Sequence, residues 1–265
     1  MRPCLRELLQ SELVFRPMGD IKEEPSPRDF PVFVVTSLKF ATTRWPAIST
    51  LLKNAGLANM ANYVYFKSED DAVRHRVQDC VSTNFSNAAP EVGLKRKHAA
   101  FNAIEHLAAA AATLHLNVSY ALILEDDATG GGAALKCLWS SVNAMATARN
   151  DTGFVQLTTW DGTLRLMVAQ SMGGQWEKFS SPVLCSDKSQ MHIETVRSPP
   201  LYTAGSNYAS AYILTARAAR VFLTNFSFFD RAIDHHMNFM HSQGGPNVDF
   251  VSPGWFGQSV HQKAH

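Results

Sequence analysis

A helical run, followed at once by a short apolar run and three carboxylates, constrains the fold of this chain most. Residues 94–116 place leucine, isoleucine, phenylalanine and alanine at helical spacing, and the many alanines favour helix. The sequence ALILEDDA, residues 121–128, then shows the pattern of a buried strand that ends in Glu125, Asp126 and Asp127. A helix joined directly to a buried strand predicts a unit in which the helix packs against a sheet.

The same alternation recurs along the chain. Strands are predicted at 31–37, 62–66 and 153–160, helices at 44–57 and 133–148, and a short strand followed by a helix within 206–226. This order predicts an α/β fold with a mostly parallel central sheet flanked by helices. Residues 170–202 are rich in Ser, Pro and Gly and break the pattern, so we interpret them as a long functional loop.

The chain has 265 residues, 46% of them hydrophobic and 18% charged, which is sufficient for a sizeable core. The first thirty residues contain the charged, proline-bearing run IKEEPSPRD and are predicted to be a peripheral tail or linker, with 31–265 as a single domain. The net charge of +1 provides no global field for a polyanion, so we expect no nucleic-acid partner. No signal peptide or membrane span is recognised in the sequence.

The cysteines and the glycosylation sequons leave the cellular compartment open. The four cysteines form no CxxC pair, which disfavours a zinc knuckle and leaves either free thiols or one or two disulfides. Four Asn-x-Ser/Thr sequons begin at Asn84, Asn117, Asn150 and Asn225. Chance alone gives about two in such a composition, so the sequons hardly favour an endomembrane lumen over the cytoplasm.

The three carboxylates follow a predicted buried strand, and ligands of parallel sheets bind beyond the carboxyl ends of the strands. Alternation along the strand places Glu125 and Asp127 on one side and Asp126 on the other. Burying such charges unpaired costs several kcal/mol each. A hard divalent cation would remove this conflict and leave positions for phosphate oxygens. A solvated acidic turn is the alternative.

ALILEDDA resembles the acidic motif of glycosyltransferase family 25, which contains lipooligosaccharide and collagen galactosyltransferases. Four other stretches resemble elements of that family in the family's order: VVTS at 34–37, GLKRKHAAFNAI at 93–104, SNYASAYILTARAARVFL at 206–223 and AIDHHMNF at 232–239. The resemblance extends over residues 32–260. The run SLKFATTRWP after the first strand and the triple glycine at 130–132 depart from the family pattern.

The resemblance implies a GT-A type nucleotide-sugar-binding fold, a UDP-sugar donor and a Mn²⁺ or Mg²⁺ ion that bridges the donor diphosphate. Glu125 and Asp127 are then the first metal or ribose contacts, with Asp126 in support and His236 as a further metal ligand. Asp234 becomes the general base that takes the proton of the acceptor hydroxyl. A helix N-cap is the alternative role for Asp234.

Further contacts are predicted around this centre. The donor-binding candidates are Thr36, Arg44, His98, Ser206 and Asn207, and the acceptor-binding candidates are Trp160, Asp161, Trp255 and Gln258. Each type of residue also has a purely structural interpretation: a surface arginine, a core histidine, a turn at Ser206–Asn207, or a tryptophan packed in the core.

These observations predict a metal-dependent hexosyltransferase. It would move a sugar, galactose by resemblance, from a UDP-sugar to a hydroxyl of a glycan or protein acceptor, with inversion at the anomeric carbon. The alternative is a catalytically inactive module of the same fold that binds a nucleotide sugar or a glycan. Thermal stabilisation by UDP with and without Mn²⁺, followed by a donor screen, separates the two.

Overall fold

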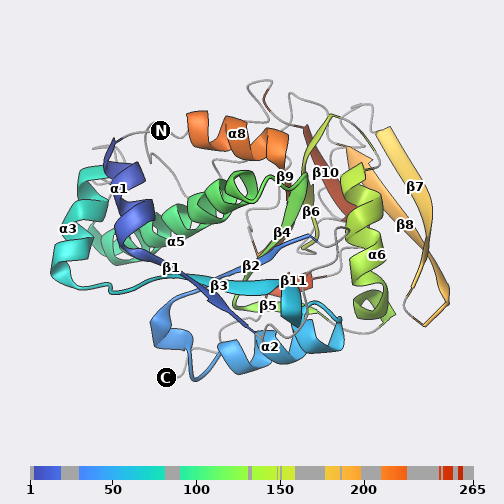
Figure 1. Ribbon diagram of the computed structural model, residues 1–265, viewed down its shortest axis with the longest axis horizontal. Coiled ribbons are helices and arrows are strands. Elements are labelled where there is room, and N and C mark those ends of the chain that lie inside the picture. Colours follow the sequence, from blue (N-terminus) through green and yellow to red (C-terminus); the bar gives the residue numbers. More distant parts are fainter. Residues whose placement is uncertain are drawn as a thin grey trace.

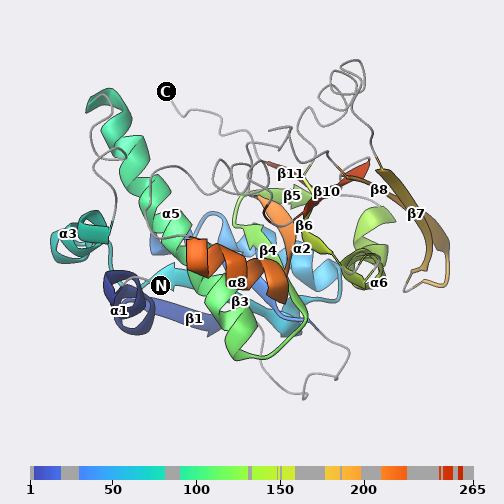
Figure 2. The same ribbon diagram turned by 90° about the horizontal axis from the view of Figure 1, so that it is seen from above.

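Helices cover both faces of a twisted central sheet in the computed structural model of the protein (Figures 1 and 2). The structure describes residues 3–18, 30–80, 90–130, 133–147, 149, 151–158, 177–185, 187–197, 210–225, 245, 247–252 and 256–258. Figure 2 shows α5 and α8 on one face of the sheet, and α2 and α6 lie toward the other face. The described part of the chain is therefore a three-layer α/β/α arrangement.

The central sheet contains nine described strands. Across the sheet these are β1 (Leu13–Pro17), β3 (Ala61–Phe66), β2 (Val32–Val35), β4 (Tyr120–Glu125), β9 (Ala211–Thr215), β6 (Thr152–Gln156), β10 (Asn247–Ser252), β8 (Gln190–Arg197) and β7 (Glu177–Leu184). Six strands run in one direction, and β1, β9 and β8 run in the opposite direction. The α/β class and the mostly parallel strand direction that the sequence predicts are thus confirmed.

Alternating side chains on the buried strands build the two cores. Val32 and Val34 of β2 face one helical layer, whereas Phe33 and Val35 face the other. β4 repeats this pattern, with Leu122 and Leu124 on one side and Ala121 and Ile123 on the other. Because both faces are covered, these strands carry continuous apolar runs instead of apolar–polar alternation.

The helices form where the sequence places apolar stripes. They are α2 (Trp45–Asn54), α3 (Asp71–Cys80), α5 (Pro90–His115), α6 (Ala133–Thr147) and α8 (Ala216–Asn225), with short 3₁₀ turns η1 (Leu38–Phe40) and η2 (Ala58–Met60). Gly56 ends α2 with a φ of 72°, a left-handed conformation that glycine adopts without strain. None of the described helices is both long and apolar enough to cross a bilayer.

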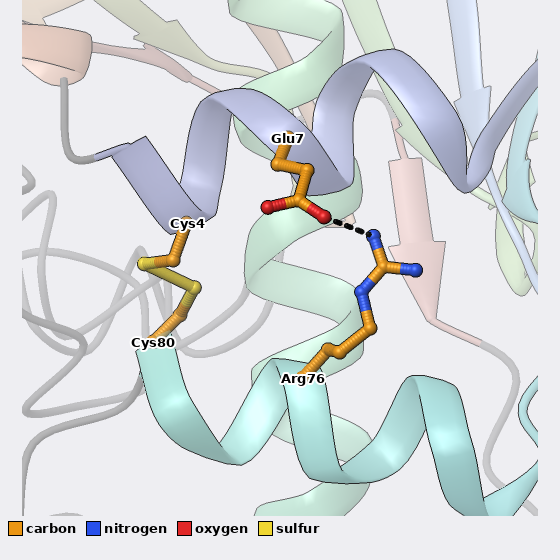
Figure 3. Close-up of a disulfide and its surroundings, with 4 residues drawn as sticks. All are labelled: Cys4, Glu7, Arg76 and Cys80. Atoms are coloured by element: carbon orange, nitrogen blue, oxygen red, sulfur yellow. Dashed lines mark hydrogen bonds and ion pairs between the residues drawn. A yellow bond between two sulfur atoms is a disulfide. The ribbon is translucent and has the colours of Figure 1, made fainter.

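The prediction that the first thirty residues form a tail is wrong for residues 3–18. Helix α1 (Pro3–Ser11) buries Leu5 and Leu8, and β1 pairs antiparallel with β3 at the edge of the sheet. A disulfide joins Cys4 of α1 to Cys80 of α3, next to an ion pair between Glu7 and Arg76 (Figure 3). Charged residues on the outer face of α1 interrupt the apolar pattern, which conceals this short amphipathic helix in the sequence.

The prediction of a loop over 170–202 is also wrong where the structure describes it. β7 and β8 form an antiparallel hairpin at the far edge of the sheet (Figure 1). Pro182 lies in β7, the outermost strand, and proline is tolerated in edge strands because they need fewer ladder hydrogen bonds. A second disulfide, Cys137–Cys185, joins α6 to the end of this hairpin's first strand.

Candidate functional site

A pocket lies where the order of the strands reverses. The chain leaves β2 to form β3 on one side and later returns to form β4 on the other side. Such a switch point opens a crevice between the carboxyl ends of the two strands, which is where open α/β sheets bind ligands. A pocket of about 150 Å³ opens here, and its lining residues are Val35, Thr36, Ser37, Lys39, Phe40, Arg44, Glu69, Phe101, Asn102, Glu105, Glu125, Asp126 and Asp127.

Asp126 connects the two strand ends. Its Oδ2 accepts a 2.5 Å hydrogen bond from the Thr36 hydroxyl, and its Oδ1 lies 2.8 Å from Nη1 of Arg44. Arg44 precedes α2, and the next residue, Trp45, donates its indole N–H to Thr36 Oγ1 at 2.6 Å. The start of α2 therefore holds Thr36, which follows β2, next to Asp126, which follows β4.

Glu125 faces the opposite helical layer. Its Oε1 accepts a 3.0 Å hydrogen bond from the Asn102 amide and lies 3.4 Å from Nε2 of His106, both on α5. Nδ1 of His106 lies 2.9 Å from the hydroxyl of Tyr212 on β9. An ionised carboxylate only accepts, so Nε2 donates its N–H to Glu125, while Nδ1 and the Tyr212 hydroxyl share the second hydrogen bond of the ring.

The two adjacent carboxylates have pKa values shifted in opposite directions. Burial raises the pKa of Glu125, but hydrogen bonds from His106 and Asn102 outweigh burial and leave the pKa below its ordinary value. Burial also raises the pKa of Asp126, and there the hydrogen bonds from Thr36 and Arg44 do not compensate, so that pKa stays above its ordinary value. Glu125 is thus stabilised as an anion, whereas Asp126 retains an electrostatic penalty.

The predicted alternation of the three carboxylates is wrong beyond Glu125. Asp127 Oδ2 lies 3.8 Å from the same Arg44 Nη1 that contacts Asp126, so the two aspartates share a side. β4 ends at Glu125, and Asp126 and Asp127 form a turn in which the two-residue period of a strand no longer applies.

Among the described lining residues of the pocket, carboxylates outnumber cations. Glu69 and Glu105 join the three acidic residues after β4, against Lys39 and Arg44. Burial, and then the charge of Glu69, raise the pKa of Glu105 well above its ordinary value, although the backbone N–H of Phe66 partly opposes this. A pocket with this balance favours a ligand that brings positive charge, such as a divalent cation bound together with phosphate.

The donor set suits a phosphate-bridging ion better than a closed metal cage. Among the residues that the structure describes, no three His, Cys, Asp or Glu side chains are arranged to hold a metal ion. Mg²⁺ commonly uses only one or two protein carboxylates and completes its shell with substrate phosphates and water. The oxygens of Asp126 and Asp127 converge on one point, now taken by the Arg44 guanidinium, and are hard ligands of the type required.

Five of the predicted site residues meet in this pocket: Thr36, Arg44, Glu125, Asp126 and Asp127. His98 and Gln258 are described by their backbone alone, in α5 and in the short strand β11 (Phe256–Gln258). β11 pairs with β5 (Ala128–Gly130), which brings the C-terminal segment beside the acidic turn. The other predictions lie outside the described residues: Asp234, His236, Ser206, Asn207, Trp160, Asp161 and Trp255.

Sequence reasoning missed the polar residues that α5 contributes to the site. Asn102, Glu105 and His106 lie three and four positions apart, and all three approach the pocket or Glu125. Their sequence signal was present, because three polar residues at helical spacing in an alanine-rich run are unusual for a core helix. Phe40 was missed as well, and its ring packs 3.8 Å from the Arg44 guanidinium carbon.

No protein-family model matches the chain, and no curated protein matches it. The assignment of an activity therefore depends on the motifs and on the geometry of the pocket.

Proposed function

We propose that the chain is a metal-dependent glycosyltransferase of the family 25 type, with a GT-A fold. It would transfer a sugar, galactose by resemblance, from a UDP-sugar to a hydroxyl of a glycan or protein. One observation carries this proposal: the acidic turn after β4 meets Thr36 and Arg44 in a pocket at the switch point of the sheet.

The pocket suits one part of the donor. Its volume of about 150 Å³ is below the roughly 300 Å³ at which pockets for drug-sized ligands begin, so the diphosphate and its immediate neighbours fit better than a whole nucleotide sugar. Asp127, supported by Asp126, would hold a Mn²⁺ or Mg²⁺ ion. When bound, such an ion neutralises charge on the leaving diphosphate.

The chain's own residues would perform the remaining tasks. Lys39 and Arg44 line the pocket and place positive charge beside the leaving diphosphate. Glu125 is held ionised by His106 and Asn102 and would accept a hydrogen bond from a donor hydroxyl. Asp234 is the proposed general base: it takes the acceptor proton as the acceptor oxygen bonds to the anomeric carbon and UDP leaves.

Thermal unfolding of the full chain with UDP, with and without Mn²⁺, tests the donor site. We expect UDP to raise Tm more when Mn²⁺ is present, because binding to the folded state alone stabilises it. Asp127→Asn should remove the Mn²⁺-dependent part of the shift. Asp71→Asn, which changes an exposed aspartate of α3 outside the pocket, is the matched control and should leave the shift intact. Equal shifts with and without Mn²⁺ would contradict a metal-bridged donor.

A screen of UDP-sugars, read out by released UDP, then tests turnover. Asp234→Asn should abolish release and spare UDP binding. Binding of UDP without release from any donor would instead identify the non-catalytic binding module.

A further inference from the structure

The four cysteines are all paired. Cys4–Cys80 and Cys137–Cys185 join residues 76 and 48 positions apart, and no cysteine remains free. Cys80, Cys137 and Cys185 are buried. Cys4–Cys80 fastens α1 to α3 (Figure 3), and Cys137–Cys185 fastens the β7–β8 hairpin to α6. In the chain-entropy account, loops of this size contribute about 4 kcal/mol each. Bridges of this kind form and persist in oxidising compartments.

One sequon lies in a suitable place for modification in such a compartment. Asn117 follows α5 with a φ of 53°, the left-handed conformation that asparagine tolerates better than most residues. The N–H of Val118 bonds to the carbonyl of Thr113 at 3.4 Å, and the N–H of Asn117 bonds to the carbonyl of Leu114 at 3.1 Å. This is the Schellman pattern, with Asn117 at the position that glycine usually occupies.

The sequon is accessible. Asn117 and Ser119 are both exposed, and within the described part of the chain no hydrogen bond engages the Asn117 side-chain amide. The neighbouring Leu116 has 53% of its surface exposed, which is unusual for a leucine beside a helix end. A hydrophilic glycan attached here would cover that apolar surface.

A glycan at Asn117 would also leave the pocket open. The sequon immediately precedes β4, and the acidic turn immediately follows β4, so the two lie at opposite ends of this strand. The other three sequons give no comparable argument. Asn84 and Asn150 lie outside the described residues, and Asn225 is described by its backbone alone.

We propose that Asn117 carries an N-linked glycan, added in the oxidising lumen where the two disulfides form. The oligosaccharide donor is a polyprenyl-diphosphate-linked sugar. Nδ2 of Asn117 bonds to the anomeric carbon, the bond from that carbon to the diphosphate oxygen breaks, Nδ2 loses one proton, and polyprenyl diphosphate leaves. The proposal is independent of the sugar-transfer activity proposed for the pocket.

Peptide mapping of the full chain, purified from the cells that naturally produce it, is the direct test. After treatment with peptide N-glycosidase, the peptide that contains residue 117 should appear with aspartate in place of asparagine. Under non-reducing conditions, the peptides that contain Cys4 and Cys80 should remain linked. Unmodified asparagine at 117, or free thiols at these cysteines, would overturn the proposal.

Variants expressed through a eukaryotic secretory pathway provide the matched controls. Asn117→Gly should lose one glycan and keep its Tm after deglycosylation, because glycine also suits the left-handed cap position. Ser119→Ala should lose the same glycan, whereas Ser119→Thr keeps the sequon and should keep the glycan. A folded Asn117→Gly protein with an unchanged number of glycans would show that Asn117 is not the acceptor.

Discussion

Two aspartate–arginine sites, one at the start of β6 and one after the end of β4, use the same chemistry with different results. Near the first residue of β6, Arg197 contacts Asp249 through Nε at 2.8 Å and Nη2 at 3.1 Å, and Asp151 through Nη1 at 2.7 Å. At the pocket, Arg44 contacts both Asp126 and Asp127 through Nη1, at 2.8 and 3.8 Å. The first site joins three strands, whereas the second lines a cavity.

The pKa directions express this difference. Hydrogen bonds from Arg197 lower the pKa of Asp151, and hydrogen bonds to Asp249 and Asp151 raise the pKa of Arg197 despite its burial. The pKa of Asp126 stays raised although Arg44 is in contact with it. Arg197 pairs fully with its aspartates and stabilises the fold. Arg44 leaves the pKa of Asp126 raised beside a cavity, and such a perturbed carboxyl group indicates a candidate binding site.

The largest expected effect belongs to the structural site. Asp249→Ala should lower the free energy of unfolding by about 3–5 kcal/mol, because it leaves a largely buried Arg197 without its main partner. Asp151→Ala removes the exposed partner of the same arginine and should cost about 1 kcal/mol or less. Urea unfolding measures both, and equal losses would contradict the distinction between the buried and exposed partners. UDP binding by the folded Asp249→Ala protein should be unchanged.

Glu125→Gln should have the next largest effect, about 1–2 kcal/mol at neutral pH, because it removes the charge that His106 and Asn102 stabilise. The folded-state pKa of Glu125 is lowered, so its contribution is present above the ordinary carboxyl pKa and is lost as the pH falls through the folded value. The stability difference between wild type and variant should therefore shrink in acid. Glu7→Gln, an exposed change on α1, should give a small difference at every pH. A stability difference between wild type and Glu125→Gln that persists in acid would contradict the lowered pKa of Glu125.

The central elements of this fold could be predicted from sequence because their signals are local. β2, β3, β4, α2 and α5 are continuous apolar runs or helical stripes. Thr36 directly follows β2, Glu125 ends β4 and the two aspartates directly follow it, and Arg44 immediately precedes α2, the helix after β2. Parallel strands bring their carboxyl ends to one edge, so residues far apart in sequence meet there. This geometric rule explains why these five residues were predicted together and lie together.

The elements that were missed are stabilised by distant contacts. The β7–β8 hairpin contains serines and Pro182 and is secured by its pairing with β10 and by Cys137–Cys185. The Arg197 site needs residues from β6, β8 and β10, which no local pattern links. Asn102 and His106 became recognisable as site residues only when α5 was placed against the end of β4.

Asp126→Asn should change the free energy of unfolding by about 1 kcal/mol or less, because asparagine still accepts hydrogen bonds and Asp127 remains near Arg44. The folded-state pKa of Asp126 is raised, so its stabilising contribution is present below the ordinary carboxyl pKa and is lost as the pH rises through the folded value. Wild type should therefore lose stability relative to the variant as the pH rises from about 4, the reverse of Glu125→Gln. Denaturant titration at several pH values measures both differences in unfolding free energy. If the differences for Asp126→Asn and Glu125→Gln change with pH in the same direction, the two carboxylates do not have pKa values shifted in opposite directions.

Arg44→Lys should have the smallest effect on folding and a modest effect on UDP affinity. Lysine keeps the positive charge but loses the planar group that packs 3.8 Å from the Phe40 ring centre. Such stacking contributes about 0.5–1 kcal/mol at partly exposed sites and orients the cation before UDP binds, so UDP affinity, measured by calorimetry, should fall by no more than about two- to five-fold. Phe40→Leu should weaken binding at least as much, because its ring centre also lies 4.8 Å from Nζ of Lys39. The double variant should be little weaker than Phe40→Leu alone, because that change already removes the stacking of Arg44. Additive losses of UDP affinity would show that Arg44 and Phe40 act separately, and that Arg44 contributes to UDP binding by its charge alone.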